Sequence, residues 1–281
     1  MYDQAQNLRN LVGKRNKVRV ISIASGKGGV GKSSIAVNLA IALGRMGVKV
    51  LVVDADFGLA NVDIMLGVTS KFDVSYFLRG EKKLEEVVQL GHEGVQFISG
   101  GSGVNTLLNM GEDQIASLLS GIVSLEKPID IILLDIGAGV NDNVIQMVLA
   151  STETIIVTTA EPTAILDAYA LVKTIVKRDN THPLHFIINK CENMKEALSV
   201  QTGFSDVVGR HLGKNINQLG LIMRDPNLPL SIKRQLPILI SEPNGQTARD
   251  INAIAGAVLD LPVEVKSGNI LSRIFSRLSG A

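Results

Sequence analysis

The sequence predicts an α/β fold, a doubly wound, mostly parallel β-sheet flanked by helices, and three observations predict it. Nearly continuous apolar runs of strand length alternate with segments whose apolar residues recur at helical spacing. A glycine-rich segment joins the first apolar run to the first helical segment, as expected of a ligand-binding turn in such a sheet. The length of 281 residues fits one large α/β domain or two small ones.

Seven apolar runs are expected to form the strands. They are residues 18–24, 48–54, 95–99, 129–135, 154–159, 184–189 and 219–223. The runs at 129–135 and 154–159 are almost continuously hydrophobic, which is typical of strands buried on both faces. Helical segments fit between the runs, for instance at 32–46, 164–177 and 247–259. This alternation places helices on both faces of the sheet, and ligands beyond the carboxyl ends of its strands.

Composition and charge exclude several classes of protein. With 46% apolar and 20% charged residues, the chain is too hydrophobic to be disordered. The 28 basic and 27 acidic residues nearly cancel, so we expect no direct binding to nucleic acid. A single cysteine excludes a disulfide framework, and an iron–sulfur or zinc site would need cysteines from a second subunit. The sequence lacks a membrane-spanning run and a signal-peptide core, so we expect a cytoplasmic protein.

Two short segments fall outside the alternating pattern. Residues 1–17 are polar and basic, and residues 263–281 follow Pro262 and contain a Ser-Gly pair. We expect both to be appendages, because neither adds a strand to a sheet easily. The predicted organisation is an N-terminal segment over 1–17, an α/β domain over 18–262, and a linker with a C-terminal helix over 263–281.

The strongest motif is G-x-x-x-x-G-K-[ST], a phosphate loop at the end of a strand and the start of a helix. Glycines there let backbone N–H groups surround phosphate oxygens, and the helix N-terminus adds its positive end. We expect Lys32 to reach the β- and γ-phosphates and the Ser33 hydroxyl to bind Mg²⁺. The expected nucleotide-binding residues of the loop are Gly26, Lys27, Gly28, Gly29, Val30, Gly31, Lys32, Ser33 and Ser34. The alternative, a glycine-rich turn without a ligand, is disfavoured by the intact motif and its flanks.

A second lysine inside the loop, Lys27, makes the motif K-G-G-x-G-K-[ST]. This resembles the deviant Walker A motif of the MinD/ParA class of P-loop ATPases. The resemblance implies an ATP- and Mg²⁺-binding protein with ATP or ADP as its ligand. It also implies that Lys27 reaches the nucleotide of a second subunit, so that ATP lies between two protomers of a homodimer. A solvated surface charge is the alternative for Lys27.

The segment from Asp54 to Asp63 resembles the D-x-D-x-G-x-x-N switch I of MinD-like ATPases. By that resemblance Asp56 positions the attacking water and Asp54 supports the Mg²⁺ site, so Lys27, Lys32 and Asp56 are the expected catalytic residues. Alternatively, either aspartate caps the following turn. The apolar run ending in Asp135 resembles a Walker B strand, which implies that Asp135 also holds Mg²⁺. MinD has a proline where this chain has Gly137, which indicates a different branch of the class.

Asn189 and Asp225 follow two later strands. In the class, an asparagine at the first position reads the adenine edge, and an acidic residue at the second lies on the base side. Both are instead turn formers in the alternative interpretation. Cys191 is expected to be a small packing residue and not a reactive thiol.

Three segments select a branch of the class. An N-terminal D-Q-A-x-x-L-R motif comprises Asp3, Gln4, Ala5, Leu8 and Arg9. Residues 161–173, EPTAILDAYALVK, and residues 224–226 with 232–235 are the other two. All three resemble the flagellar-number regulators of the FlhG family, also called FleN or YlxH.

That resemblance implies a slow ATPase that dimerises with ATP and binds the inner face of the cell membrane as a dimer. It implies partnership with the GTPase FlhF through the N-terminal motif, and with the flagellar C-ring proteins FliM and FliN or FliY. Some members instead restrain a flagellar transcription activator. The alternatives are a MinD-like division-site regulator, a ParA-like DNA partition ATPase and a metabolic P-loop enzyme.

The C-terminal segment has an amphipathic pattern. One helical face would carry Ile270, Leu271, Ile274, Phe275 and Leu278, whereas the other carries serines and arginines. Such a helix fits a membrane interface, and its alternative is a helix docked on its own domain or on a partner. We therefore expect a cytoplasmic protein that associates reversibly with the membrane.

Overall fold

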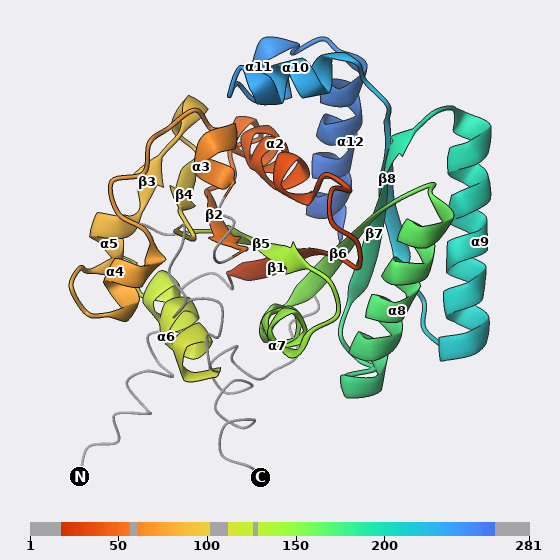
Figure 1. Cartoon of the computed structure of the whole chain (residues 1–281), viewed down its shortest axis with the longest axis horizontal. Coiled ribbons are helices and arrows are strands. Elements are labelled where there is room, and N and C mark those ends of the chain that lie inside the picture. Colours follow the sequence, from red (N-terminus) through yellow and green to blue (C-terminus); the bar gives the residue numbers. More distant parts are fainter. Residues whose placement is uncertain (1–17, 57–60, 102–111, 126–128, 262–281) are drawn as a thin grey trace.

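The computed structural model describes residues 18–56, 61–101, 112–125 and 129–261. The predicted N-terminal motif and the predicted C-terminal helix lie outside these residues. The described elements form one eight-stranded sheet with helices on both faces, as the sequence predicts (Figure 1). No helix within the described ranges is long and apolar enough to cross a membrane.

The sheet has the strand order β3-β4-β2-β5-β1-β6-β7-β8. All pairs are parallel except β3 with β4, which is antiparallel. The strands are β1 (Arg19–Ser25), β2 (Val50–Ala55), β3 (Gln89–Leu90), β4 (Gln96–Ile98), β5 (Ile131–Ala138), β6 (Glu153–Thr159), β7 (Leu184–Cys191) and β8 (Asn217–Met223). All seven predicted strands are therefore confirmed, and among the strands of the described residues only the two-residue β3 lies outside the predicted runs.

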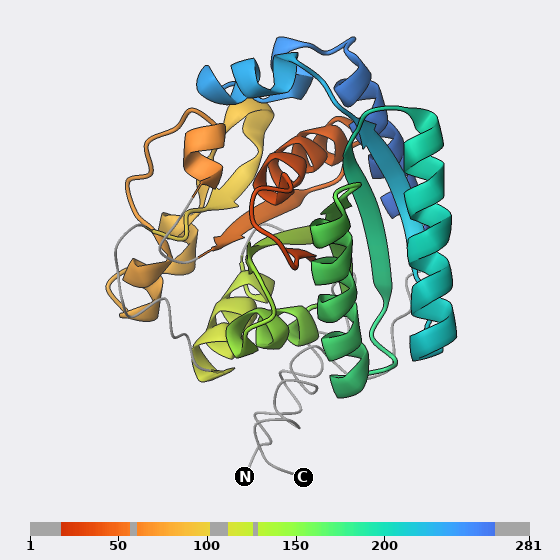
Figure 2. The same cartoon turned by 45° about the vertical axis from the view of Figure 1, so that its right-hand side comes forward.

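Two layers of helices cover the sheet (Figures 1 and 2). Buried residues of α2 (Lys32–Arg45), α3 (Val62–Met65), α11 (Ile238–Ser241) and α12 (Gln246–Asp260) pack on one face. The other face carries α4 (Val74–Leu78), α5 (Leu84–Val87), α6 (Glu112–Val123), α7 (Asp142–Ala150), α8 (Pro162–Arg178) and α9 (Met194–Leu212). The short η1 (His92–Gly94) and α10 (Asn227–Lys233) complete the described elements.

Side chains of β1 point alternately to the two faces of the sheet, so β1 contributes to both helical layers. Ile21 and Ile23 pack into the layer of α2 and α12, whereas Val20 and Ala24 pack into the opposite layer. Because β1 lies between β5 and β6, both of its edges are hydrogen-bonded and both of its faces are buried. The loop that follows β1 is therefore held by a rigid central strand.

A buried ionic network lies at the amino ends of the central strands. Arg19 donates two hydrogen bonds to Glu153, of 2.9 and 3.0 Å, and a third of 2.9 Å to the Val258 carbonyl of α12. His185 Nε2 lies 3.3 Å from the second oxygen of Glu153. Burial alone would raise the pKa of Glu153, but the hydrogen bonds from His185 and Arg19 outweigh it and hold the pKa below its usual value. The network thus joins β1, β6, β7 and α12.

Candidate functional site

The phosphate-loop sequence forms a tight turn between Ser25 of β1 and Lys32 of α2. Gly29 and Gly31 have φ of +76° and +102°, a backbone conformation that glycine adopts at little cost. Gly26 is required for a different reason: a Cβ there would lie 2.2 Å from the Asp167 carbonyl oxygen of α8. The loop therefore packs directly on α8.

Lys32 and Ser33 begin helix α2, whose N-terminus faces the loop. Lys32 is only 8% exposed, and its ammonium is close enough to Asp56 and Asp135 to favour their charged forms. A buried lysine at a helix N-terminus is well suited to bind an anion. The predicted phosphate-binding residues are thus brought together in one turn.

Asp54 and Asp135 lie opposite each other on the neighbouring strands β2 and β5. Asp54 accepts backbone N–H bonds from Asp56, Asn61 and Val62, at 3.1, 2.7 and 3.0 Å. Burial nevertheless raises the pKa of Asp54 to about 6, against these three hydrogen bonds. The pair is therefore a concentration of buried negative charge.

Neither carboxylate oxygen of Asp135 has a hydrogen-bond partner within the described residues, although the side chain is buried. Burial, and then the charge of Asp54, raise the pKa of Asp135 to about 7, while nearby Ser33 and Lys32 act in the opposite direction. A buried carboxylate without a partner beside a hydroxyl fits Mg²⁺, which takes oxygen ligands and keeps several waters. The residues present, Ser33 and Asp135 with Asp54 in support, therefore suit the predicted metal. No group of three acidic, histidine or cysteine side chains suited to a metal occurs among the described residues, and such a site does not require one.

Asp56 lies at the end of β2, on the same edge as the loop, and is half-buried. Burial raises its pKa, and the Lys32 ammonium opposes that shift. A Cβ at position 137 would lie 3.0 Å from Asp56 Oδ1, so Gly137 leaves room for this carboxylate. Phe57 to Ala60, the next part of the switch I motif, lie outside the described residues.

Lys27 lies apart from Lys32. Its side chain is 37% exposed, and its ammonium donates to Glu161 at 2.6 Å and to the Thr163 hydroxyl at 2.9 Å. Both partners belong to the E-P-T segment at the start of α8. The lysine of the loop is therefore held at the surface by its own chain.

Asn189 and Lys190, at the end of β7, contact the back of the loop. The Asn189 amide donates to the Val30 carbonyl at 2.7 Å, and the Lys190 ammonium donates to the Gly29 carbonyl at 2.8 Å. The structure thus places Asn189 against the loop, and its predicted contact with adenine stays a prediction. Sequence reasoning missed Lys190, Glu161 and Thr163 as site residues. In the sequence, the E-P-T segment indicates only a resemblance to the family.

Asp225 and Cys191 both have structural roles in the described part of the chain. Asp225 accepts hydrogen bonds from the Asn227 N–H and the Thr247 hydroxyl, both at 2.9 Å, so it caps the turn that leads into α10. Its base-side role stays a prediction. Cys191 is fully buried, and burial raises the pKa of its thiol to about 11. A packing role therefore agrees with its surroundings.

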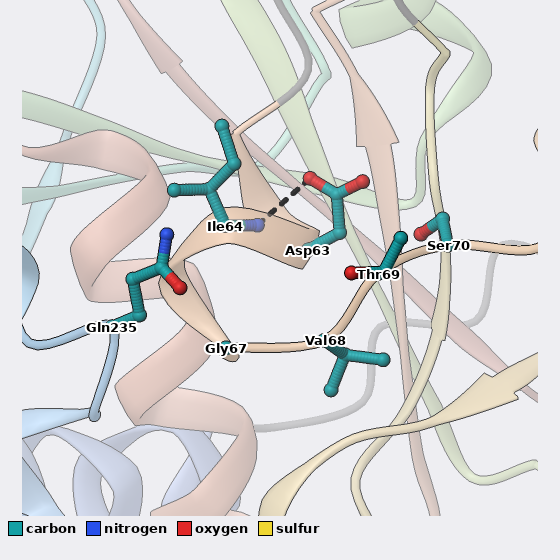
Figure 3. Close-up of a pocket in the computed structure, with 7 residues that line it drawn as sticks. All are labelled: Asp63, Ile64, Gly67, Val68, Thr69, Ser70 and Gln235. Carbon is teal, nitrogen blue, oxygen red and sulfur yellow. Dashed lines mark hydrogen bonds between the residues drawn. The ribbon is translucent and has the colours of Figure 1, made fainter.

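A separate small cavity, of about 270 Å³, borders α3 (Figure 3). It is lined by Asp63, Ile64, Gly67, Val68, Thr69, Ser70 and Gln235. None of the residues predicted to bind nucleotide lines it. The Asp63 carboxylate accepts the N–H of Ile64 at 2.8 Å and the Ser99 hydroxyl at 3.2 Å.

The loop, its buried lysine and the carboxylate pair define a P-loop nucleotide-binding protein. Residues 16–259 match the ParA family, described as NUBPL iron-transfer P-loop NTPase, and the chain therefore belongs to this family. Within it, the chain is 30% identical over 267 residues to the antiactivator FleN of Pseudomonas aeruginosa, covering 95% of each protein. It is 32% identical over 278 residues to the flagellum site-determining protein YlxH of Helicobacter pylori, covering 92% of this chain and 91% of that one.

Solved structures of the same fold include those of cell division proteins. The cell division ATPase MinD of Pyrococcus furiosus superposes with a TM-score of 0.74 at 25% identity, covering 87% of this chain and 99% of that one. MinD of Pyrococcus horikoshii, complexed with Mg-ADP, gives a TM-score of 0.73 at 29% identity, covering 86% and 96%. The predicted MinD/ParA class with its FlhG branch is thereby confirmed.

Proposed function

We propose that this protein is an ATP-dependent dimerisation switch with slow ATP hydrolysis. The loop with Lys32 and Ser33 binds the nucleotide phosphates, and Asp56 orients the attacking water. Ser33 and Asp135, with Asp54 in support, would hold Mg²⁺, which would supply positive charge to offset the charge that develops on the phosphates. The Mg-ADP complex of the related MinD supports this choice of ligand.

The observation that carries the proposal is the contrast between the two lysines of the loop. Lys32 is 8% exposed and faces the buried carboxylates, whereas the Lys27 side chain is 37% exposed and pairs with a surface glutamate. Water screens an exposed ion pair of this kind, so it contributes little to stability and releases the lysine readily. Lys27 is thus available to a nucleotide held by a second subunit.

Sizing chromatography with ATP tests the switch through two variants. Asp56→Ala should bind ATP, hydrolyse it poorly and accumulate as a dimer, because only the water-orienting group is lost. Lys27→Ala should retain nucleotide binding but remain a monomer. Lys173→Ala, which removes an exposed lysine further along α8, is the control and should dimerise normally. A Lys27→Ala protein that dimerised like wild type would refute the intersubunit role.

We propose that the switch regulates flagellar number and placement, together with FlhF and the C-ring proteins FliM and FliN or FliY. The similarity to FleN and YlxH over more than nine-tenths of the chain supports this. The name of FleN as an antiactivator also makes a flagellar transcription activator a partner to test. A pulldown with FlhF and the C-ring proteins, with and without ATP, tests the assignment. Failure to retain any of them in either state would contradict it.

A MinD-like division-site regulator is the second candidate. It is favoured by the structural similarity to MinD, including MinD in the MinC:MinD complex of Aquifex aeolicus. Gly137 and the flagellar segments disfavour it. Capture of a MinC-type protein in the same pulldown, in place of FlhF, would select this candidate. Iron–sulfur transfer is disfavoured, because the chain has one cysteine and Cys191 is fully buried.

A further inference from the structure

The end of β7 holds two successive carbonyl groups of the phosphate loop. Asn189 Nδ2 donates to the Val30 carbonyl at 2.7 Å, and Lys190 Nζ donates to the Gly29 carbonyl at 2.8 Å. The two donors are coupled, because the Lys190 N–H itself donates to Asn189 Oδ1 at 2.9 Å. Asn189 also fills the space beside Gly31, where a Cβ would lie 2.4 Å from its amide nitrogen.

These contacts determine where the loop's amide groups point. In a planar trans peptide the C=O and the following N–H point in opposite directions. Holding the carbonyls of Gly29 and Val30 on the β7 side therefore turns the N–H groups of Val30 and Gly31 to the other side. Within the described residues neither N–H donates a backbone hydrogen bond, so both are available to an anion.

Lys190 reaches its position at a conformational cost. Its φ is +59°, in the left-handed region that residues with a Cβ rarely adopt. Such a conformation persists where surrounding contacts hold it. The Lys190 ammonium makes one such contact, with the Gly29 carbonyl. A charged donor forms a stronger hydrogen bond than a neutral one.

We propose that Lys190 is a positioning residue for phosphate binding: its ammonium holds the Gly29 carbonyl outward, so that the loop's N–H groups are directed at the phosphates before nucleotide arrives. The inference rests on the proposed nucleotide-binding function of the loop. It gives the end of β7 a second task besides the predicted contact of Asn189 with the base. It also assigns a role to a residue outside the G-x-x-x-x-G-K-[ST] motif.

Three substitutions at Lys190 separate its charge from its backbone conformation. Lys190→Met removes the ammonium and should raise the Kd for ADP with Mg²⁺ about tenfold, as expected for one charge-assisted hydrogen bond. Lys190→Arg retains a cationic donor and should stay within about threefold of wild type. Lys190→Gly relieves the left-handed strain without a donor, so it should bind as weakly as Lys190→Met. Lys195→Met removes the same charge from the exposed start of α9 and should have no effect.

NMR relaxation of the nucleotide-free protein supplies a readout that does not depend on nucleotide. The backbone order parameters of Val30 and Gly31 should fall in Lys190→Met and Lys190→Gly, and should be retained in Lys190→Arg. Unchanged loop order in Lys190→Met, or wild-type affinity in Lys190→Gly, would overturn the proposal. A weaker Kd with unchanged loop order would also overturn it, because the ammonium would then act on the nucleotide itself. Absence of ADP binding by the wild type would refute the proposed function, while the relaxation data would still decide the role of Lys190.

Discussion

Asp54 and Asp135 lie opposite each other on adjacent strands, yet their carboxylates are stabilised very differently. Asp54 accepts hydrogen bonds from three backbone N–H groups, whereas neither carboxylate oxygen of Asp135 has a hydrogen-bond partner within the described residues. A buried charge without a partner destabilises a fold. The Asp135 carboxylate therefore lowers the stability of the nucleotide-free protein, which is typical of a residue that serves binding.

Opposite stability effects are expected for two aspartate-to-asparagine substitutions. Asp135→Asn removes a buried charge that has no hydrogen-bond partner, so it should raise the free energy of unfolding by about 1 kcal/mol. This corresponds to a melting temperature about 2–4 °C higher. Asp54→Asn weakens three hydrogen bonds and should lower the free energy of unfolding by about 1–3 kcal/mol. Thermal unfolding of the nucleotide-free proteins measures both. Equal losses in the two variants would contradict this account.

A substitution at Gly137 tests the catalytic role of Asp56 without changing Asp56 itself. A methyl group at position 137 would lie 3.0 Å from Asp56 Oδ1 and should displace the carboxylate. Gly137→Ala should therefore lower the kcat of ATP hydrolysis about tenfold, because small displacements of catalytic groups are costly. The nucleotide Kd should stay unchanged. Gly203→Ala, where a Cβ meets no atom within 4 Å, is the control. An unchanged kcat in Gly137→Ala would argue against Asp56 as the water-positioning residue.

At the scale of elements, the buried network of Arg19, Glu153 and His185 ties three strands to the end of α12. Removing one member of a buried ion pair leaves the other charge unpaired. Glu153→Gln should therefore lower the free energy of unfolding at pH 7 by about 3 kcal/mol.

The same variant has a defined pH dependence. The pKa of Glu153 is lower in the folded protein, so its charge stabilises the fold above the ordinary pKa of a glutamate. That stabilisation is lost as the pH falls below about 4.5 and through the lowered folded value. Urea unfolding at pH 7 and at progressively lower pH should show the difference between wild type and Glu153→Gln shrinking in acid. A difference that stayed constant over this range would argue that Glu153 is not the titrating group.

The sequence predicts the elements with strong hydrophobic periodicity and misses the short ones. All seven apolar runs form strands, and in central strands such as β1 and β2 burial on both faces leaves a continuous pattern. The strand β3, with two residues and an exposed Leu90, carries no such pattern. The positions of Lys32, Asp54 and Asp135 follow from one rule, since parallel strands bring their carboxyl ends to one edge. The contacts of Lys27 with Glu161, and of Lys190 with Gly29, depend on side-chain rotamers and on a left-handed φ that no motif signals.

At the scale of the whole molecule, the described domain contains the predicted nucleotide-binding residues, and the predicted targeting segments lie outside it. The predicted helix around Phe275 should bind weakly as one copy, because ordering a short helix offsets much of the apolar gain. Two copies on one dimer gain effective concentration. ATP would thus control membrane residence through dimerisation.

Liposome flotation tests this control. Wild type with ATP should float with vesicles that contain anionic lipid, whereas protein with ADP should not. Phe275→Glu places a charge among the apolar residues and should abolish flotation, while Ser276→Glu on the polar face should only weaken it. ATP hydrolysis in solution should be the same in all three proteins. Equal flotation of wild type and Phe275→Glu would show that this segment is not a membrane anchor.

The central place of β1 also determines when a newly made chain can first hold a nucleotide. The ribosome completes the phosphate loop early, but both hydrogen-bonding neighbours of β1, Ile131–Ala138 and Glu153–Thr159, are made much later. Lys190 emerges later still. Until both neighbouring strands are made, β1 is an apolar strand with two unpaired edges, which is the kind of segment that aggregates during synthesis. Pairing over such sequence separation is slow. We therefore expect the nascent chain to depend on chaperones until residue 159 has left the ribosome, and to gain nucleotide binding in a later step, after residue 190 has followed.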